Sequence, residues 1–227
     1  GAKVRDARMW SAFIDEARTN FKDAENYFAS HHWPLWGKEN INDFLVVQRD
    51  TYKFIHDQSV RLMNQGLTPN EIADQIELPE ALNKSFHNQG YYGTAKHNSR
   101  AVYQGYLGWY TANPSTLDAL PETKAAKRYV DMMGGADAVL EKAQAQFDAA
   151  ADMDIQEGKD AYRWLAELVN HVVFADADNS KAKALLAKVY DQLGYQAEAA
   201  PWRDFYLTGA YELRHGPAEK GINPAVM

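Results

Sequence analysis

The chain has 227 residues, of which 46% are apolar and 12% aromatic. This composition excludes wholesale disorder and predicts one large domain or two small ones with a substantial core. The net charge of −7 argues against a nucleic acid or an anionic membrane surface as the main partner. Since the chain has no cysteine, disulfides, thiolate metal sites and cysteine nucleophiles are excluded, and no apolar run is long enough to predict a transmembrane helix.

Apolar residues at helical spacing, together with glycine and proline breaks, predict the elements of the first half. The predicted elements are a helix over 3–22, a strand end over 26–30, a helix over 40–65, short helices over 68–79 and 79–86, and a helix over 94–109. Thr68, Pro69 and Glu71 give the third helix the pattern of a capping box.

From Pro121 onward the sequence predicts only helices, over 121–132, 134–151, 158–174, 180–193 and 196–213. Gly158, followed by Tyr162 and Ala166, is echoed by Gly194, followed by Ala197 and Trp202. This spacing of about 36 residues predicts tetratricopeptide-like helix pairs, too few for a solenoid and suited to an assembly module.

Two adjacent histidines, His31 and His32, lie in the stretch "FASHHWPLWG". Zinc sites need three or four protein ligands, and no histidine spacing in the chain matches a known zinc motif. From the residues alone, a buried, hydrogen-bonded pair and an incomplete metal site both stay open. The seven histidines are His31, His32, His56, His87, His97, His171 and His215.

Two further segments invite a functional interpretation. "GLTPNEIADQIELPEALNKSF" has the outline of a helix-turn-helix, but its second helix offers only Lys84 to a phosphate, which argues against DNA binding. In "NQGYYGTAKHNSRAVYQGYLGWY", His97, Asn98 and Arg100 begin a helix after a glycine loop. A helix N-terminus beside a cation favours an anion, whereas a solvated helix cap is the alternative.

Several segments together resemble the alkylsulfatases of the metallo-β-lactamase superfamily, the type that hydrolyses sodium dodecyl sulfate. They are "SHHWPLWG", "YKFIHDQ", "NQGLTPNEIA", "HNQGYYGTAKHNSRAVYQGYLGWY" and "YVDMMGGADAVL". The resemblance runs from Gly1 to about Gly216. It implies an all-α fold of tetratricopeptide-like helix pairs that follows a short remnant of an α/β hydrolase domain.

The resemblance also implies a division of the chain into domains. Residues 1–40 would be the C-terminal remnant of a metallo-β-lactamase-type hydrolase domain, and 41–90 a helical connector. Residues 91–216 would form the alkyl sulfatase dimerisation domain. The last segment, 217–227, has glycine and proline without periodicity and would link to a sterol-carrier-like domain.

The resemblance implies a binuclear zinc site to which the "SHHWP" segment contributes the last histidine ligand. By pattern that ligand is His31, with His32 the second choice. The superfamily motif H-x-H-x-D-H is absent from the chain. We therefore expect the chain to be a fragment that by itself is inactive and holds no complete zinc site.

The activity that the resemblance implies is hydrolysis of an alkyl sulfate ester by a zinc-activated water. It makes His97 and Tyr103 candidates for catalysis, and Tyr92, Asn98 and Arg100 candidates for binding the sulfate. It further implies a homodimer in the periplasm or outside the cell. The alternative is a helical dimerisation module with no chemistry of its own.

Overall fold

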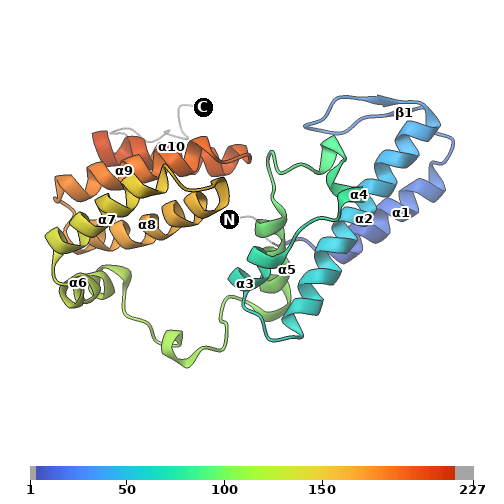
Figure 1. The fold of residues 1–227 in the computed structure, drawn as a ribbon. Helices are drawn as coiled ribbons and strands as arrows, with labels where there is room; N and C mark the ends of the chain where they lie inside the picture. Colours follow the sequence, from blue (N-terminus) through green and yellow to red (C-terminus); the bar gives the residue numbers. More distant parts are fainter. Residues whose placement is uncertain (1–3, 218–227) are drawn as a thin grey trace, which may run out of the picture. The chain divides into compact units, whose positions relative to one another are not determined.

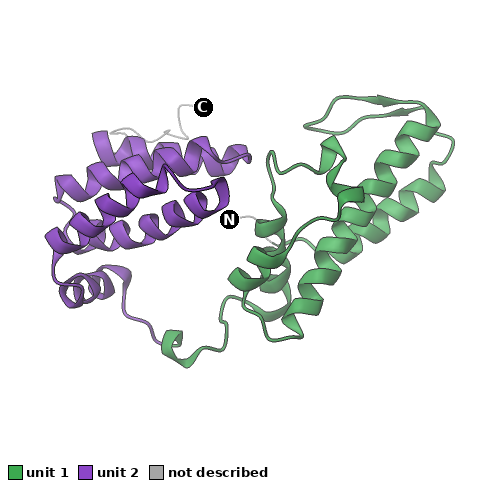
Figure 2. Ribbon diagram, viewed as in Figure 1, with its two compact units in different colours: residues 1–117 green, residues 118–227 purple. Residues whose placement is uncertain are grey.

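The computed structural model describes residues 4–217, which contain ten α-helices and one two-stranded hairpin (Figure 1). Clustering of close contacts divides the chain into two compact units, 1–117 and 118–227 (Figure 2). The all-α fold expected from the sequence is confirmed. The residue limits 40, 90 and 216 proposed for the domains stay predictions.

Unit 1 is organised around one long helix, α2. The elements of this unit are α1 (Ala7–Asn20), β1 (Asn26–Tyr27), β2 (Leu35–Trp36), α2 (Lys38–Met63), α3 (Pro69–Gln75), α4 (Glu80–Asn83), the 3₁₀ turn η1 (Phe86–Asn88), α5 (Ala95–Leu107) and the 3₁₀ turn η2 (Pro114–Thr116). Helix α1 packs along α2, and α3 and α5 pack on each other and on α2. The capping box at Thr68 and Glu71 forms as expected.

The strand expected over 26–30 extends only over Asn26 and Tyr27. It pairs antiparallel with β2, so that Asn26 lies opposite Trp36 and Tyr27 opposite Leu35. This hairpin is the whole of the β structure in the described residues. Two short strands do not identify the remnant of an α/β domain, which remains a prediction.

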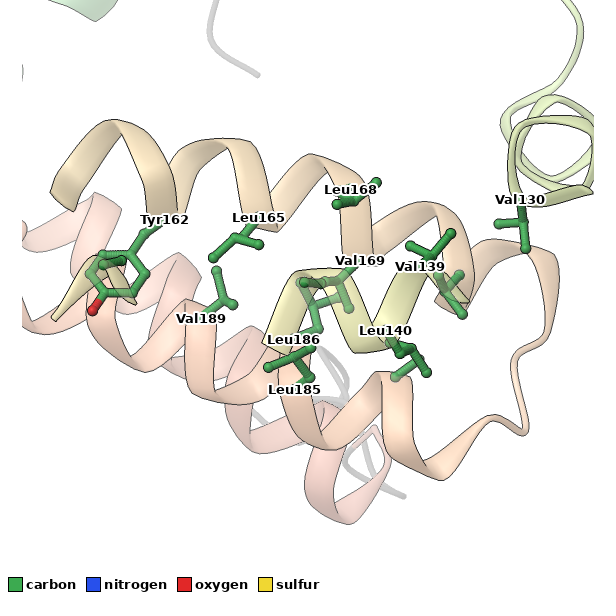
Figure 3. Packing of buried hydrophobic residues seen from close by; sticks show 14 of the residues in the cluster. Val130, Val139, Leu140, Tyr162, Leu165, Leu168, Val169, Leu185, Leu186 and Val189 are labelled. Atoms are coloured by element: carbon green, nitrogen blue, oxygen red, sulfur yellow. The ribbon is translucent and has the colours of Figure 1, made fainter. Parts of the chain in front are cut away.

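Unit 2 is a stack of helices around one apolar core. Its helices are α6 (Glu122–Met132), α7 (Ala136–Ala150), α8 (Ile155–Ala175), α9 (Ser180–Tyr195) and α10 (Ala200–His215). Helix α8 packs on α6, α7 and α9, and α9 packs on α10. Figure 3 shows Leu165 and Val169 of α8 directed towards Leu186 and Val189 of α9, all buried.

Gly158 and Gly194, which stand at the boundaries of predicted helices, lie inside the observed helices. Helix α8 begins at Ile155, where Asp154 accepts hydrogen bonds from two backbone N–H groups, so Gly158 stands in its first turn. Gly194 is in the last turn of α9. The predicted helix starts at 158 and 196 are therefore wrong, whereas the tetratricopeptide-like pairing of helices stays a prediction.

Close packing explains why glycine stands at position 194. A Cβ atom there would lie 2.8 Å from Cδ2 and 2.9 Å from Cγ of Leu207 in α10. The backbone of α9 thus approaches the side chains of α10 more closely than any other residue would allow. Gly194 therefore allows close contact between α9 and α10, although the sequence pattern indicated the end of a helix there.

We predict that Gly194→Ala destabilises unit 2 by about 1 kcal/mol, because overpacking costs about 1–3 kcal/mol and exceeds the gain in helix propensity of about 1 kcal/mol. Urea unfolding followed by circular dichroism measures the change. Gly105→Ala in α5 is the control, since its Cβ would meet only Val4 Cγ1, at 3.3 Å. Equal stabilisation by both substitutions would contradict the packing argument.

Candidate functional site

All six residues that the sequence analysis singled out for chemistry lie in unit 1. His31 is in the turn of the β1–β2 hairpin, whereas Tyr92, His97, Asn98, Arg100 and Tyr103 belong to α5 and the loop before it. The five residues from Tyr92 to Tyr103 are near one another because they belong to one short segment of the chain. The structure gives no contact between His31 and that group among the described residues.

The start of α5 exposes two of the candidate side chains. Thr94 caps the helix, and its hydroxyl accepts a hydrogen bond from the backbone N–H of His97 at 3.0 Å. His97 and Asn98 are exposed, and Tyr92, in the preceding loop, is 80% exposed. The Asn98 amide lies over Gly93, 3.6 Å from the place of a Cβ atom on that glycine. The predicted anion site thus has its polar groups at the surface.

Arg100 links α5 to the neighbouring helix α3. Its Nε donates a hydrogen bond to Oδ1 of Asn70 at 3.0 Å, which holds the guanidinium against the first turn of α3. Partial burial and the positive charge of Arg100 lower the pKa of His97 below the ordinary 6.5. At neutral pH His97 is therefore a neutral imidazole, suited to accept or donate a hydrogen bond rather than to add a charge.

Tyr103 lies on the other side of α5. It is only 6% exposed and packs with Leu62 of α2 and Ile72 of α3. Ser99 and Val102, at neighbouring positions of the same helix face, are buried too. The ring of Tyr103 is therefore part of the packing of unit 1, and the structure does not bring it together with His97 and Asn98.

The two adjacent histidines have different surroundings. His31 has the left-handed backbone conformation, with φ of 70°, and its exposed ring makes no hydrogen bond or ring contact with the described residues. A non-glycine residue in this conformation is strained. The neighbouring His32 is partly buried, and both of its ring nitrogens have partners.

His32 forms a hydrogen-bonded pair with His87 of η1, a contact that the sequence did not predict. Nδ1 of His32 lies 2.6 Å from the carbonyl oxygen of Trp33, and Nε2 lies 2.8 Å from Nδ1 of His87. Because a carbonyl only accepts, Nδ1 of His32 carries the proton, and Nε2 of the neutral ring accepts from His87. Burial, and then the electrostatic interaction with His32, lower the pKa of His87.

Aromatic rings surround this pair. The ring centroid of Trp33 is 4.4 Å from that of His32, and Phe44 of α2 lies 4.7 Å from His87, edge to face. Phe86 packs on Trp33. The rings fix the pair in the corner between the hairpin and η1, which agrees with the interpretation of His32 as a buried, hydrogen-bonded histidine.

The described residues alone do not make a zinc site. Among residues 4–217, no three histidine, aspartate or glutamate side chains converge on a point where a metal ion could bind. His32 and His87 offer one ring nitrogen between them that is neither protonated nor engaged, which is too few for a site of three or four ligands.

Two surface grooves lie along α1 and α2, away from the candidate residues. One, of about 430 Å³, is lined mainly by aromatic and aliphatic side chains, among them Trp10, Phe13 and Phe44. The other, of about 390 Å³, has a polar lining that includes Arg18 and Lys38. None of the six candidate residues lines either groove, so neither identifies a site for them.

Comparison with known proteins places the chain in a family. The family model described as "Alkyl sulfatase dimerisation" matches residues 68–216, which cover the whole of unit 2 up to Gly216 and the C-terminal part of unit 1. The chain belongs to the alkyl sulfatase dimerisation family. This finding confirms the resemblance noted from the sequence.

Relatives with assigned names are alkylsulfatases. The chain is 50% identical over 217 residues to a linear primary-alkylsulfatase of Pseudomonas sp., a match that covers 95% of this chain and 31% of that protein. It is also 50% identical to the alkyl/aryl-sulfatase BDS1 of Saccharomyces cerevisiae, over 95% of this chain and 32% of that one. The chain thus spans about a third of the length of these relatives.

A solved alkylsulfatase structure has the same fold over this segment. The structure of the stereoselective inverting sec-alkylsulfatase Pisa1 from Pseudomonas sp. superposes with a TM-score of 0.91 at 44% identity. The match covers 99% of this chain and 34% of that chain. Within residues 4–217, none of the helices of this family member combines the length and apolarity that crossing a bilayer requires.

We predict that His97 titrates below pH 6.5 and that Arg100→Gln raises its pKa only partly, because the effect of burial remains. Since the folded chain binds this proton more weakly than the unfolded chain, the stability contribution of His97 is lost as the pH falls below about 6.5. NMR titration of the histidine ring protons measures the pKa. Arg61→Gln on α2 is the control, and an unchanged pKa in Arg100→Gln would contradict the prediction.

Proposed function

We propose that this chain is part of a zinc-dependent alkylsulfatase, which hydrolyses sulfate esters such as dodecyl sulfate to an alcohol and sulfate. The observation that carries the proposal is the 50% identity to a linear primary-alkylsulfatase over 95% of the chain. Similarity of this degree along both units favours a common activity over a shared helical scaffold alone. The enzyme acts in the periplasm or outside the cell, as the resemblance to alkylsulfatases implies.

In this proposal the segment supplies the dimer interface, part of the substrate pocket and one zinc ligand. The match to the dimerisation family includes all five helices of unit 2, which contain none of the candidate site residues. Unit 2 therefore serves assembly of a homodimer. Unit 1 holds the chemistry that this segment contributes.

His31 is the proposed zinc ligand. Its exposed ring leaves both nitrogens available, whereas His32 uses Nδ1 on the Trp33 carbonyl and Nε2 on His87. Metal binding by His32 would break the hydrogen bond to His87, but binding by His31 requires no such loss. The strained backbone at His31 agrees with a conformation kept for a function.

The start of α5 is the proposed contact for the sulfate group. The backbone N–H groups of a helix N-terminus and the guanidinium of Arg100 favour an anion there, and Tyr92 and Asn98 can donate hydrogen bonds to its oxygens. His97, exposed and neutral at pH 7, is the proposed acid–base group of this segment. Tyr103 contributes by holding α5 against α2 and α3.

The alternative, a helical dimerisation module without chemistry, describes the isolated chain. It is favoured by the family match to a dimerisation domain. The two proposals differ only for a longer polypeptide that carries this segment. Measuring the metal content and activity of the isolated chain and of the longer polypeptide therefore distinguishes the two proposals.

We expect the 227-residue chain to bind no stoichiometric zinc and to release no sulfate from dodecyl sulfate. A full-length enzyme that carries the segment should bind two zinc ions and be active, and His31→Ala there should remove zinc and most activity. His32→Ala is the matched control and should retain the metal. Elemental analysis and sulfate release measure these outcomes. Two zinc ions per isolated chain, or an active full-length His31→Ala enzyme, would refute the proposal.

The assembly role makes a separate prediction. We expect the 227-residue chain to be a dimer at micromolar concentration, because all five helices of unit 2 lie within the matched dimerisation segment. Size-exclusion chromatography with light scattering gives the mass directly. A mass near 25.6 kDa, that of one chain, across the micromolar range would count against this role.

A further inference from the structure

A chain of polar contacts in unit 1 ends at a tyrosine that the proposed function does not use. Nδ1 of His56 in α2 lies 2.8 Å from Oδ1 of Asp57, and its Nε2 lies 2.7 Å from the hydroxyl of Tyr106 in α5. Lys53 binds the other carboxylate oxygen of Asp57. The imidazole of His56 is only 7% exposed. Adjacent side chains on a helix point in different directions, so the contact between His56 and Asp57 is unusual.

The hydrogen-bond partners of Asp57 and His56 indicate which atoms carry protons. Burial alone would raise the pKa of Asp57, but the hydrogen bonds from Lys53 and His56 outweigh burial and lower the pKa. Asp57 is thus a carboxylate at neutral pH and accepts the Nδ1–H of His56. In the neutral imidazole the other nitrogen, Nε2, is then an acceptor, and the bond it makes is donated by the hydroxyl of Tyr106.

This arrangement is that of an oriented base next to a nucleophile. A carboxylate fixes the tautomer of a histidine, and the free nitrogen of that histidine receives the proton of a hydroxyl. Here the hydroxyl belongs to a tyrosine that is 56% exposed, so part of its side chain faces the solvent. We propose that Tyr106 is a nucleophilic phenol, activated by His56 and Asp57, and a selective site of modification by sulfonyl electrophiles.

The reaction with an aryl sulfonyl fluoride illustrates the chemistry. The phenol oxygen of Tyr106 attacks the sulfur atom, so an O–S bond forms and the S–F bond breaks. The phenol proton passes to Nε2 of His56, and fluoride leaves with the electron pair of the S–F bond. The product is an aryl sulfonate ester of Tyr106, and His56 returns its proton to the solvent.

The experiment compares Tyr106 with Tyr211 in the 227-residue chain. The two rings are similarly exposed, at 56% and 59%, and Tyr211 also lies against a histidine, His215, with ring centroids 4.5 Å apart. No hydrogen bond joins the Tyr211 hydroxyl to the described residues. Mass spectrometry of peptides after treatment with an aryl sulfonyl fluoride gives the labelling rate at each tyrosine. We expect Tyr106 to react about a hundredfold faster, the lower end of a general-base effect.

Variants test the role of the base. His56→Gln keeps an amide near Nε2 but removes the base, and should lower labelling of Tyr106 to the rate of Tyr211. Asp57→Asn should lower it partly, because a neutral amide orients the imidazole less strongly. His215→Gln should leave Tyr211 unchanged. Circular dichroism checks that each variant folds. If His56→Gln does not fold, the proposal is tested by the wild-type labelling rates at Tyr106 and Tyr211 and by the labelling of Tyr106 in Asp57→Asn.

Two results would overturn the proposal. Equal labelling rates at Tyr106 and Tyr211 in the folded wild-type chain would mean that the His56 contact only ties α2 to α5. Undiminished labelling of Tyr106 in folded His56→Gln or Asp57→Asn would mean that exposure, and not the base, sets its reactivity.

Discussion

The burial of α2 is the constraint on which unit 1 depends. Helices α1, α3 and α5, the hairpin and η1 all pack on this 26-residue helix. Ile55 joins the cluster with Ile76 and Val102, and Leu62 joins the cluster with Ile72 and Tyr103. The polar groups buried with them are paired, since the hydroxyl of Ser59 donates to the Ile55 carbonyl and both nitrogens of His56 are bound. One helix therefore sets the positions of both the histidine turn and α5.

The helices could be predicted from the sequence because their apolar spacing and caps are local signals. The Thr68 capping box is an example, since Thr68 and Glu71, three positions apart, define it. The errors at Gly158 and Gly194 have the opposite cause. Glycine has poor helix propensity, so within one segment it indicates a break. The reason for Gly194 is the side chain of Leu207 in the next helix, and no local pattern contains that information.

The candidate site also has features that local sequence patterns predict and features that they do not. Ser99, Val102 and Tyr103 are buried at helical spacing, which is a local pattern. The pairs that join distant segments could not be predicted, because 55 residues separate His32 from His87 and 50 separate His56 from Tyr106. Neither pair matches a motif, and each depends on how η1 or α5 docks on the rest of unit 1.

The histidines of unit 1 show how surroundings decide the role of one side chain. His31 is exposed on a strained turn, His32 has both nitrogens satisfied, and His56 is buried between a carboxylate and a phenol. The ring is the same, but the acceptor on Nδ1 fixes which nitrogen carries the proton in His32 and His56. A carbonyl does this for His32 and directs Nε2 to a second imidazole. A carboxylate does it for His56 and directs Nε2 to the hydroxyl of Tyr106, the proposed nucleophile.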